Sequence, residues 1–422
     1  MRQYIGLAGT TACPRCVVLQ ASVDPMILAQ AAAAVPVAIW LYLMVARGGF
    51  WRVSRALQRG SSSASDLVVG RRSRRVVAVI PARNEAESIG RAVRSLLAQT
   101  DEVPLHIIIV DDGSTDGTAD EAKSAAEAAG ASAAARLTVL RGTPPAVGWT
   151  GKLWAMSQGV AAAGAHHPDF LLLTDADIEY APGEVVALAD KAEAERLDLV
   201  SLMVRLSTAT FAERCLIPAF VFFFLKLYPP AWIAAPRSAV AGAAGGCMLL
   251  RPAALARAGG LAAIRGCIID DCALARVIKS SGGRIWLGLA RQTRSLRIYG
   301  TFGQIGAMIS RTAFNQLRHS YVVLGATLLG LVVTYLAPPL LLLARAPVMV
   351  GFGAAAWLLM TASYLPMVRF YRLSPAYALT LPAVALFYSA ATVHSAIQYA
   401  AGRGGRWKGR AQDVRSAGEP GT

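Results

Sequence analysis

LHIIIVDDGSTDG, residues 105–117, is an apolar run that ends in an acidic turn, and FLLLTDAD, residues 170–177, repeats this arrangement. Apolar runs of this length predict buried strands, and the Asp, Gly and Ser residues that follow predict turns. Carboxylates at the carboxyl ends of parallel strands collect in the crevice where open α/β sheets bind ligands. Two short-spaced acidic pairs there suit a divalent cation and a diphosphate, because hard cations take oxygen ligands and bridge phosphate oxygens. The two stretches therefore predict an α/β domain for nucleotide-activated substrates.

Strands and helices alternate around these two stretches. The predicted strands are Val76–Ile80, Leu105–Val110, Leu137–Leu140 and Phe170–Leu173, and the predicted helices run from Asn84 to Leu97, from Thr118 to about Ala135 and from Leu153 to Ala163. Asn84 with Glu87, and Thr118 with Glu121, have the spacing of a capping box and predict where two of the helices begin. Alternation of this kind predicts a Rossmann-like, mostly parallel sheet.

The composition adds membrane segments to this domain. The 422 residues are 55% hydrophobic and only 16% charged, and the mean hydropathy of +0.45 is unusual for a wholly soluble enzyme. The net charge of +16 is concentrated beside the apolar runs. Basic residues placed there anchor a protein to an anionic leaflet, so the charge favours a bilayer over nucleic acid as the partner.

The first apolar run, Met26 to Ala46, carries no charge and is long enough to cross a bilayer. Eight arginines and only one acidic residue, Asp66, follow it before Val76. Those arginines disfavour a cleaved signal peptide. By the positive-inside rule the run is an anchor in the cell inner membrane, with the domain that follows it in the cytoplasm.

Three further uncharged runs lie near the end of the chain: Ser320–Ala344, Ala346–Val368 and Leu373–Ala401. Three full spans would place the basic tail outside, against the positive-inside rule, so either one run is re-entrant or interfacial, or the tail breaks the rule. Ile217–Ile233 and Tyr299–Phe314 are predicted to lie along the membrane surface. If Ile217–Ile233 crossed the bilayer once, Asp175 and Asp271 would lie on opposite faces of the membrane.

The predicted organisation has six parts: an N-terminal extension (1–25), a transmembrane anchor (26–47), a basic linker (48–75), the α/β domain with its interfacial segments (76–319), a C-terminal transmembrane region (320–401) and a basic tail (402–422). Cys13 and Cys16 have metal-site or redox spacing, but no second pair completes a four-ligand site. Free thiols are therefore expected, in keeping with a reducing cytoplasm.

Four motifs in this order resemble family 2 glycosyltransferases with the GT-A fold: VIPARNE (79–85), VDDGSTD (110–116), TDAD (174–177) and IDD (269–271). Two more, GWTGKLWA (148–155) and RTAFNQLR (311–318), are similar to the hopene-associated branch of that family. The resemblance extends from about Val76 to Arg318.

The resemblance implies a role for each motif residue. The predicted donor-binding residues are Pro81, Arg83, Glu85, Asp111, Asp112, Lys152, Asp175, Arg311 and Arg318. Asp175 and Asp177 resemble the DxD element, whose carboxylates can hold Mg²⁺ or Mn²⁺. Arg311 and Arg318 are rival diphosphate ligands. A helix-start charge is the alternative for Glu85, and an Asx-rich turn is the alternative for Asp111 and Asp112.

Asp270 and Asp271 are the predicted catalytic pair, because adjacent carboxylates can raise the pKa of one of them toward the operating pH of a general base. The resemblance favours Asp271 as the base, and an N-cap is the alternative. Gly242–Gly246 is either the acceptor entrance or a tight turn.

Together these features predict a membrane-bound inverting glycosyltransferase. It would take a nucleotide-diphospho-sugar, with UDP-sugars favoured, and a lipid acceptor that the resemblance relates to hopanoids; no nucleic acid is expected. Two alternatives stay open. One is a processive polysaccharide synthase, which would be expected to have more membrane helices, and the other is a catalytically inactive nucleotide-binding membrane scaffold.

Overall fold

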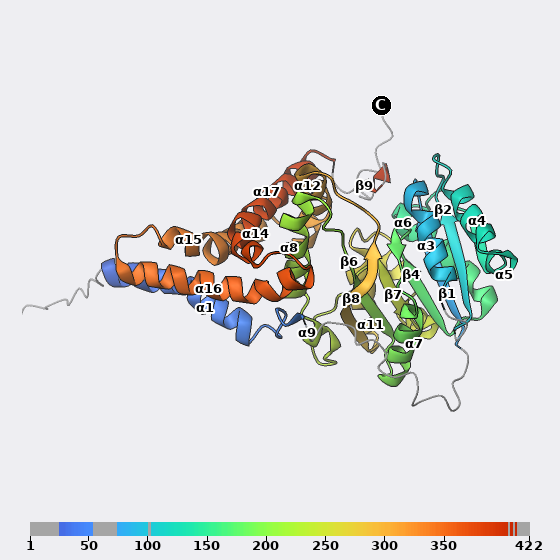
Figure 1. Cartoon of the computed structure of the whole chain (residues 1–422), viewed down its shortest axis with the longest axis horizontal. Coiled ribbons are helices and arrows are strands. Elements are labelled where there is room, and N and C mark those ends of the chain that lie inside the picture. The colour runs from blue at the N-terminus through green and yellow to red at the C-terminus, as the bar shows by residue number, and fades with distance from the viewer. Residues whose placement is uncertain (1–24, 54–73, 100–102, 404–405, 408–409, 412–422) are drawn as a thin grey trace, which may run out of the picture.

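The computed structural model of the chain describes residues 25–53, 74–99, 103–403, 406–407 and 410–411. These residues form a lobe built on a β-sheet and a lobe of long apolar helices (Figure 1). The predictions for Cys13 and Cys16, for the N-terminal extension and for most of the basic linker and tail fall outside the described residues.

The first half of the sheet is parallel, as predicted. Its four strands lie in the order β3-β2-β1-β4: β1 (Val76–Ala82), β2 (Leu105–Asp111), β3 (Leu137–Arg141) and β4 (Phe170–Thr174). The helices between them are α3 (Ala86–Leu97), α4 (Thr118–Ala128), α5 (Ala131–Ala134) and α6 (Gly151–Ala163), followed by a 3₁₀ turn η1 (Gly164–His166). Every residue of β1 is buried, which is typical of a central strand with helices on both faces.

The second half of the sheet corrects the prediction of a mostly parallel sheet, because it is mixed. The strands continue from β4 in the order β7-β6-β8-β5: β5 (Ile178–Glu179), β6 (Leu199–Arg205), β7 (Cys247–Leu250) and β8 (Ile285–Ser295). β7 runs antiparallel to both β4 and β6, and β5 runs antiparallel to β8. The chain leaves the sheet after β6 for a long helical excursion, so the strand–helix alternation that predicts parallel pairing is absent here.

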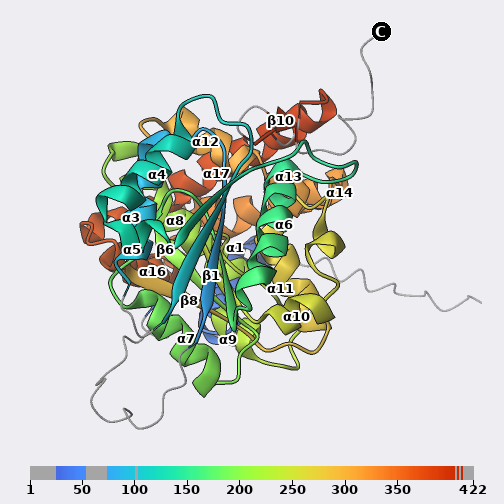
Figure 2. The same ribbon diagram turned by 90° about the vertical axis from the view of Figure 1, so that its right-hand side faces the viewer.

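Helices cover both faces of the sheet (Figure 2). On one face of the sheet, residues such as Ile80 pack against α3, α4 and α7 (Glu184–Ala194). On the other face, residues such as Val79 pack against α6 and α11 (Asp270–Ser280). A Cβ on Gly159 of α6 would lie 2.4 Å from Val79 Cγ1, so glycine lets this helix approach the sheet closely. Two short elements, α10 (Pro252–Arg257) and η2 (Leu261–Ile264), precede α11.

The two predicted capping boxes are not formed. The N-cap of α3 is Glu85, and Asn84 instead has a left-handed backbone and accepts a hydrogen bond from the Thr115 N–H at 2.9 Å. The N-cap of α4 is Gly117, and the Thr118 hydroxyl accepts from the Glu85 N–H at 2.9 Å. Both side chains join the two loops to each other, and this tertiary contact replaces the local cap.

The apolar lobe consists of α1 (Pro25–Val45), α14 (Tyr321–Leu331), a π-helical turn η3 (Val332–Leu336), α15 (Ala337–Leu341), α16 (Pro347–Phe370), η4 (Pro375–Thr380) and α17 (Leu381–Ala400). α1 lies along α16 (Figure 1). Within the described residues, five helical segments are long and apolar enough to cross a membrane: Met26–Val45, Phe211–Ala234, Tyr321–Leu341, Pro347–Phe370 and Pro375–Ala400. A two-stranded hairpin, β9 (Arg406–Trp407) with β10 (Arg410–Ala411), follows.

The helix α8 (Phe211–Leu227), together with α9 (Pro230–Ala234), α12 (Phe302–Ser310) and α13 (Ala313–Gln316), forms the junction between the lobes. α8 begins with a capping box of Thr210 and Glu213 that the sequence analysis did not identify. The fully buried Glu213 also accepts a 2.6 Å hydrogen bond from the Tyr299 N–H. At the other side the Tyr388 hydroxyl of α17 donates to the Leu216 carbonyl at 3.1 Å. α8 is thus fixed to both lobes.

Candidate functional site

A cavity of about 350 Å³ lies where the carboxyl ends of β1 and β4 meet α6, α11 and the junction helices. Eight of the predicted site residues line it: Pro81, Glu85, Lys152, Asp175, Asp177, Asp270, Asp271 and Arg311. They come from segments far apart in the sequence. The fold therefore brings the predicted metal pair, the predicted base and the predicted phosphate-binding lysine to one place.

Four predicted donor-binding residues, Arg83, Asp111, Asp112 and Arg318, are not among the residues that line this cavity. Asp111 Oδ1 accepts from the Ser114 N–H at 3.0 Å, as in the alternative of an Asx-rich turn. Asp112 is 2% exposed, and Arg83 binds its carbonyl and approaches its carboxylate at 3.7 Å. Arg311 lines the cavity and Arg318 does not, so Arg311 is the better placed of the two rival arginines.

Lys152 joins two of the acidic groups. It is the second residue of α6, and its Nζ lies 2.9 Å from Asp175 Oδ1 and 3.1 Å from Asp270 Oδ2. Burial acts to lower the pKa of Lys152, but attraction from Asp175 and Asp270 outweighs it and raises the pKa above its usual value. The lysine is therefore a permanent cation in the cavity, suited to anionic phosphate oxygens.

Asp271 is held by backbone donors. Its Oδ2 accepts from the Gly245 N–H at 2.9 Å, and its Oδ1 accepts from the Cys272 N–H at 2.6 Å. Gly245 is kept in place because its neighbour Ala244 donates its N–H to the buried Ser201 hydroxyl at 2.8 Å. Asp271 lies in the first turn of α11 and is not its N-cap, which is Ile269.

Burial raises the pKa of Asp271 to about 6, and repulsion from Asp270 adds to this, against the opposing effects of Lys152 and the two backbone donors. A carboxylate with this pKa is ionised at neutral pH and is still basic enough to accept a proton from a hydroxyl in a transition state. Within the pair, Asp270 contacts Lys152 and Asp271 has the raised pKa. The role of Asp271 as the general base stays a prediction.

Arg297 is a site residue that the sequence analysis missed. It follows β8, and its guanidinium bridges Glu85 (Nη2 to Oε1, 2.8 Å) and Asp177 (Nε to Oδ2, 3.1 Å). The Ser295 hydroxyl donates to the same Asp177 oxygen at 3.2 Å. The sequence signal available for Arg297 was its position just beyond the end of a strand, but Arg297 belongs to none of the motifs. A planar fork of N–H donors there suits phosphate oxygens as well as carboxylates.

The carboxylates of Asp175 and Asp177 fit a divalent cation in part. Both are hard oxygen donors at the edge of one cavity, which is the chemistry that Mg²⁺ and Mn²⁺ prefer. Within the described part of the chain, no group of three or more His, Cys, Asp or Glu residues could hold a metal ion. Lys152 and Arg297 form ion pairs with the two carboxylates. The pair therefore fits a cation that a bound phosphate also ligates.

The cavity has an apolar side as well. Phe220 and Phe224 of α8 and Met308 of α12 line it together with the acidic residues. Arg311 and Thr312, which follow α12, line it too. The polar site thus continues into the junction between the sheet lobe and the apolar helices.

Residues 77–257 match the family Glycosyl transferase family 2. The chain is 30% identical over 131 residues to glucosyl-3-phosphoglycerate synthase of Mycolicibacterium smegmatis, covering 31% of this chain and 40% of that protein. It is 37% identical over 103 residues to 4,4'-diaponeurosporenoate glycosyltransferase of Staphylococcus aureus, covering 24% of each. The matches thus span less than half the length of these relatives.

Among solved structures, a mannosyltransferase from Pyrobaculum calidifontis, in complex with GDP-Man and Mn²⁺, is similar with a TM-score of 0.50 and 19% identity. The similarity covers 87% of this chain and 98% of that one. The chain therefore has the predicted GT-A fold, with a sheet that is mixed and not mostly parallel, and residues 77–257 are similar to family 2 glycosyltransferases.

Proposed function

We propose that this chain is a membrane-bound inverting glycosyltransferase that moves a sugar from a nucleotide-diphospho-sugar to a hydroxyl of a lipid. One observation carries the proposal: a single cavity holds a partly buried lysine, an acidic pair, a carboxylate of raised pKa and apolar side chains of the junction helices. The family 2 domain supports the reaction class.

The proposed reaction is a direct displacement at the anomeric carbon. The acceptor oxygen forms a bond to that carbon while the bond to the donor diphosphate breaks, and the nucleoside diphosphate leaves with the electron pair. Asp271 takes the proton of the attacking hydroxyl. Lys152, Arg297 and Arg311 line the cavity and would bind the diphosphate oxygens. Because no protein group forms a bond to the sugar, the anomeric configuration inverts.

Asp175 and Asp177 would hold Mg²⁺ or Mn²⁺ together with the donor phosphates. When bound, such a cation neutralises the diphosphate and helps it leave. Lys152 and Arg297, which pair with these carboxylates, would then contact phosphate oxygens. UDP-sugars are the proposed donors because the motif VDDGSTD (110–116) resembles the donor-binding turn of family 2 glycosyltransferases; Asp111 and Asp112 of this motif lie outside the cavity lining.

The proposed acceptor arrives from the membrane along α8 and α12, whose side chains Phe220, Phe224 and Met308 reach the cavity. A hopanoid-related lipid is the proposed acceptor, on the resemblance of the flanking motifs. Asp175 and Asp271 line the same cavity. A single membrane crossing by α8, which lies between them in the sequence, would place them on opposite sides of the bilayer, so their proximity supports α8 as an interfacial helix.

Comparing the membrane lipids of cells with and without this protein by mass spectrometry tests the proposal: one glycolipid should disappear.

The raised pKa of Asp271 gives an expected pH dependence. A general base must be deprotonated, and its pKa is raised to about 6, so turnover should fall as the pH drops through about 6 and should level off above it. Initial rates between pH 5 and 8 measure this, with donor affinity followed over the same range. A rate that stays constant down to pH 5 would show that this carboxylate is not the base.

The catalytic lobe is expected on the cytoplasmic side of the inner membrane. Ser132 of α5 is exposed, so Ser132→Cys in a cysteine-depleted chain gives a reporter in this lobe. Impermeant thiol reagents should leave it unlabelled in intact cells and label it after lysis. Labelling in intact cells would place the lobe on the outer side and reverse the proposed topology.

A further inference from the structure

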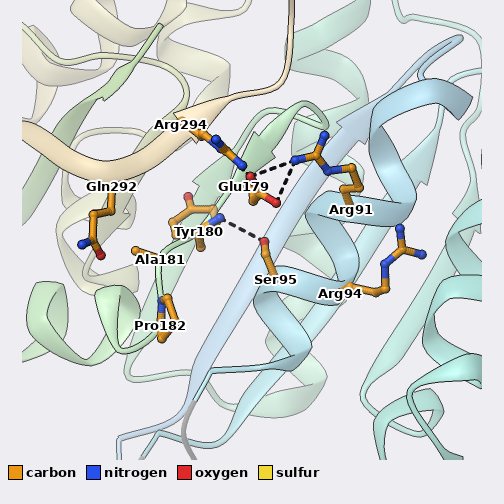
Figure 3. A pocket seen from close by; sticks show the side chains of 9 residues that line it. All are labelled: Arg91, Arg94, Ser95, Glu179, Tyr180, Ala181, Pro182, Gln292 and Arg294. Atoms are coloured by element: carbon orange, nitrogen blue, oxygen red, sulfur yellow. Dashed lines mark hydrogen bonds and ion pairs between the residues drawn. The ribbon is translucent and has the colours of Figure 1, made fainter. Parts of the chain in front are cut away.

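A second cavity, of about 660 Å³, lies in the sheet lobe outside the proposed catalytic site. The residues that line it come from α3, from β5 and the loop after it, and from β8 (Figure 3): Arg91, Arg94, Ser95, Glu179, Tyr180, Ala181, Pro182, Gln292 and Arg294. Three of them are arginines and one is acidic. At neutral pH the lining therefore has a positive excess, which favours an anionic ligand.

Two of the arginines share one carboxylate. Arg91 Nη2 lies 3.0 and 3.1 Å from the two oxygens of Glu179, and Arg294 Nε lies 2.6 Å from Glu179 Oε2 (Figure 3). Burial acts to raise the pKa of Glu179, but the hydrogen bonds from Arg294 and Arg91 lower it below its usual value. The Arg91 and Arg294 side chains remain 49% and 57% exposed, so each guanidinium keeps N–H donors available for a ligand.

The floor of this cavity is preorganised. The Tyr180 N–H donates to the Ser95 hydroxyl at 3.0 Å, and the Ala181 N–H donates to the Thr293 hydroxyl at 3.1 Å. The Ala181 carbonyl accepts from Gln99 Nε2 at 3.0 Å. These bonds fix the loop between β5 and α7 against α3 and β8. A ligand would therefore meet a hydrogen-bonded floor, with the half-exposed Arg91 and Arg294 at the rim, and ordering this floor would cost little on binding.

We propose that this cavity is a second anion site, which takes a ligand bearing phosphate groups. Paired guanidinium forks match phosphate oxygens bidentately, and the arginines here are held 2.6–3.1 Å from a carboxylate that a phosphate can replace as their partner. The cavity is lined by α3, β5 and β8, and Figure 1 shows α3 on the side of the sheet lobe away from α1 and α16. A soluble phosphorylated molecule is therefore the proposed ligand, in preference to a lipid headgroup.

The site is connected to the proposed metal pair through two paired strands. Glu179 is two residues beyond Asp177, and β5 pairs with β8 so that Ile178 lies opposite Ser295 and Glu179 lies opposite Arg294. Ser295 in turn donates to Asp177. A ligand that draws Arg294 away from Glu179 would thus act on the paired strands β5 and β8 next to Asp177. This gives the second anion site a route to influence the proposed catalytic site.

Titration of inorganic pyrophosphate into the purified full chain, in chelator and followed by calorimetry, tests the proposal. The parent is a Lys152→Gln variant, so that binding at the proposed donor site is weakened. Arg91→Gln with Arg294→Gln should lower the remaining affinity at least about tenfold, because two charge-assisted contacts are lost. Arg257→Gln is the matched control, since Arg257 is an exposed arginine that pairs with Asp198 at 3.2 Å, and it should change the affinity less than about twofold.

Unchanged affinity in the double variant, an equal loss in the Arg257 control, or no binding to the parent would each overturn the proposal. If the double variant does not fold, Arg94→Gln alone should weaken binding at least about threefold, and unchanged binding would again contradict the proposal. Vesicles with phosphomonoester headgroups form a second arm. Vesicle binding that depends on Arg91 and Arg294, without binding of free pyrophosphate, would overturn the assignment of a soluble ligand.

Discussion

Replacing Asp271 by Asn is expected to reduce kcat by roughly 10²–10⁴-fold, which is the usual contribution of a general base, while donor affinity changes little. The reason is positional. Asp271 is bonded to the Gly245 and Cys272 N–H groups, whereas the carboxylates of the proposed metal pair, Asp175 and Asp177, contact Lys152 and Arg297. Its removal therefore leaves the proposed metal–diphosphate site in place and blocks only the attack by the acceptor.

Two controls sharpen this expectation. An Asn side chain presents an NH₂ group to one of the two backbone donors, so thermal unfolding of Asp271→Asn must be checked before the kinetics are interpreted. Asp270→Asn should have the smaller effect on kcat and should alter donor affinity instead, because Asp270 contacts Lys152 at 3.1 Å. Near-normal turnover in Asp271→Asn with loss in Asp270→Asn would exchange the two roles, and full activity in both would refute the mechanism.

Removal of divalent cations is the second large expected effect. Excess chelator should lower turnover by on the order of 10²-fold or more, because Lewis-acid help to a leaving diphosphate is worth several kcal/mol. Asp177→Ala should lower it similarly, mainly by weakening binding of the metal and the diphosphate. Initial rates with Mn²⁺ restored at increasing concentration measure both effects. Full activity in chelator would remove the metal from the mechanism.

The two-carboxylate donor set adds a more specific expectation. Because the predicted metal pair supplies two carboxylates, each of which contacts a cationic side chain (Lys152 or Arg297), Mn²⁺ should bind weakly to the protein alone and more tightly when UDP is present. Ser295→Ala is the matched control for Asp177→Ala, because it removes one 3.2 Å hydrogen bond to Asp177 and leaves the carboxylate. It should have only a small effect. Tight Mn²⁺ binding without nucleotide would contradict this reading of the site.

Much of the first half of the domain could be predicted because its signals are local. The apolar runs at Val76, Leu105, Leu137 and Phe170 each lie between turn residues, and each became a strand of the parallel half-sheet. The acidic motifs follow such strands, so the rule that carboxyl ends of parallel strands meet at one edge was enough to place Asp175 and Asp177 at the cavity.

The rest depends on contacts between distant segments. Arg297 meets Glu85 across 212 positions, and no local pattern reports that pairing. The side chains of Asn84 and Thr118 have capping-box spacing, yet each bonds to the other loop, because tertiary hydrogen bonds replaced the local caps. The antiparallel strand β7 returns after the helical excursion of α8 and α9, where the sequence carries neither alternation nor a hairpin turn.

Sugar transfer by the purified protein is the measurement that tests the central claim most directly. The chain in detergent, with Mn²⁺ and a membrane lipid extract, is given each of a panel of labelled nucleotide-diphospho-sugars, and label in the lipid phase is counted. One donor, a UDP-sugar on our account, should label a lipid with an inverted anomeric centre, and Asp271→Asn should abolish the signal. Binding of UDP without transfer of any sugar to lipid or water would contradict the account and indicate a nucleotide-binding scaffold.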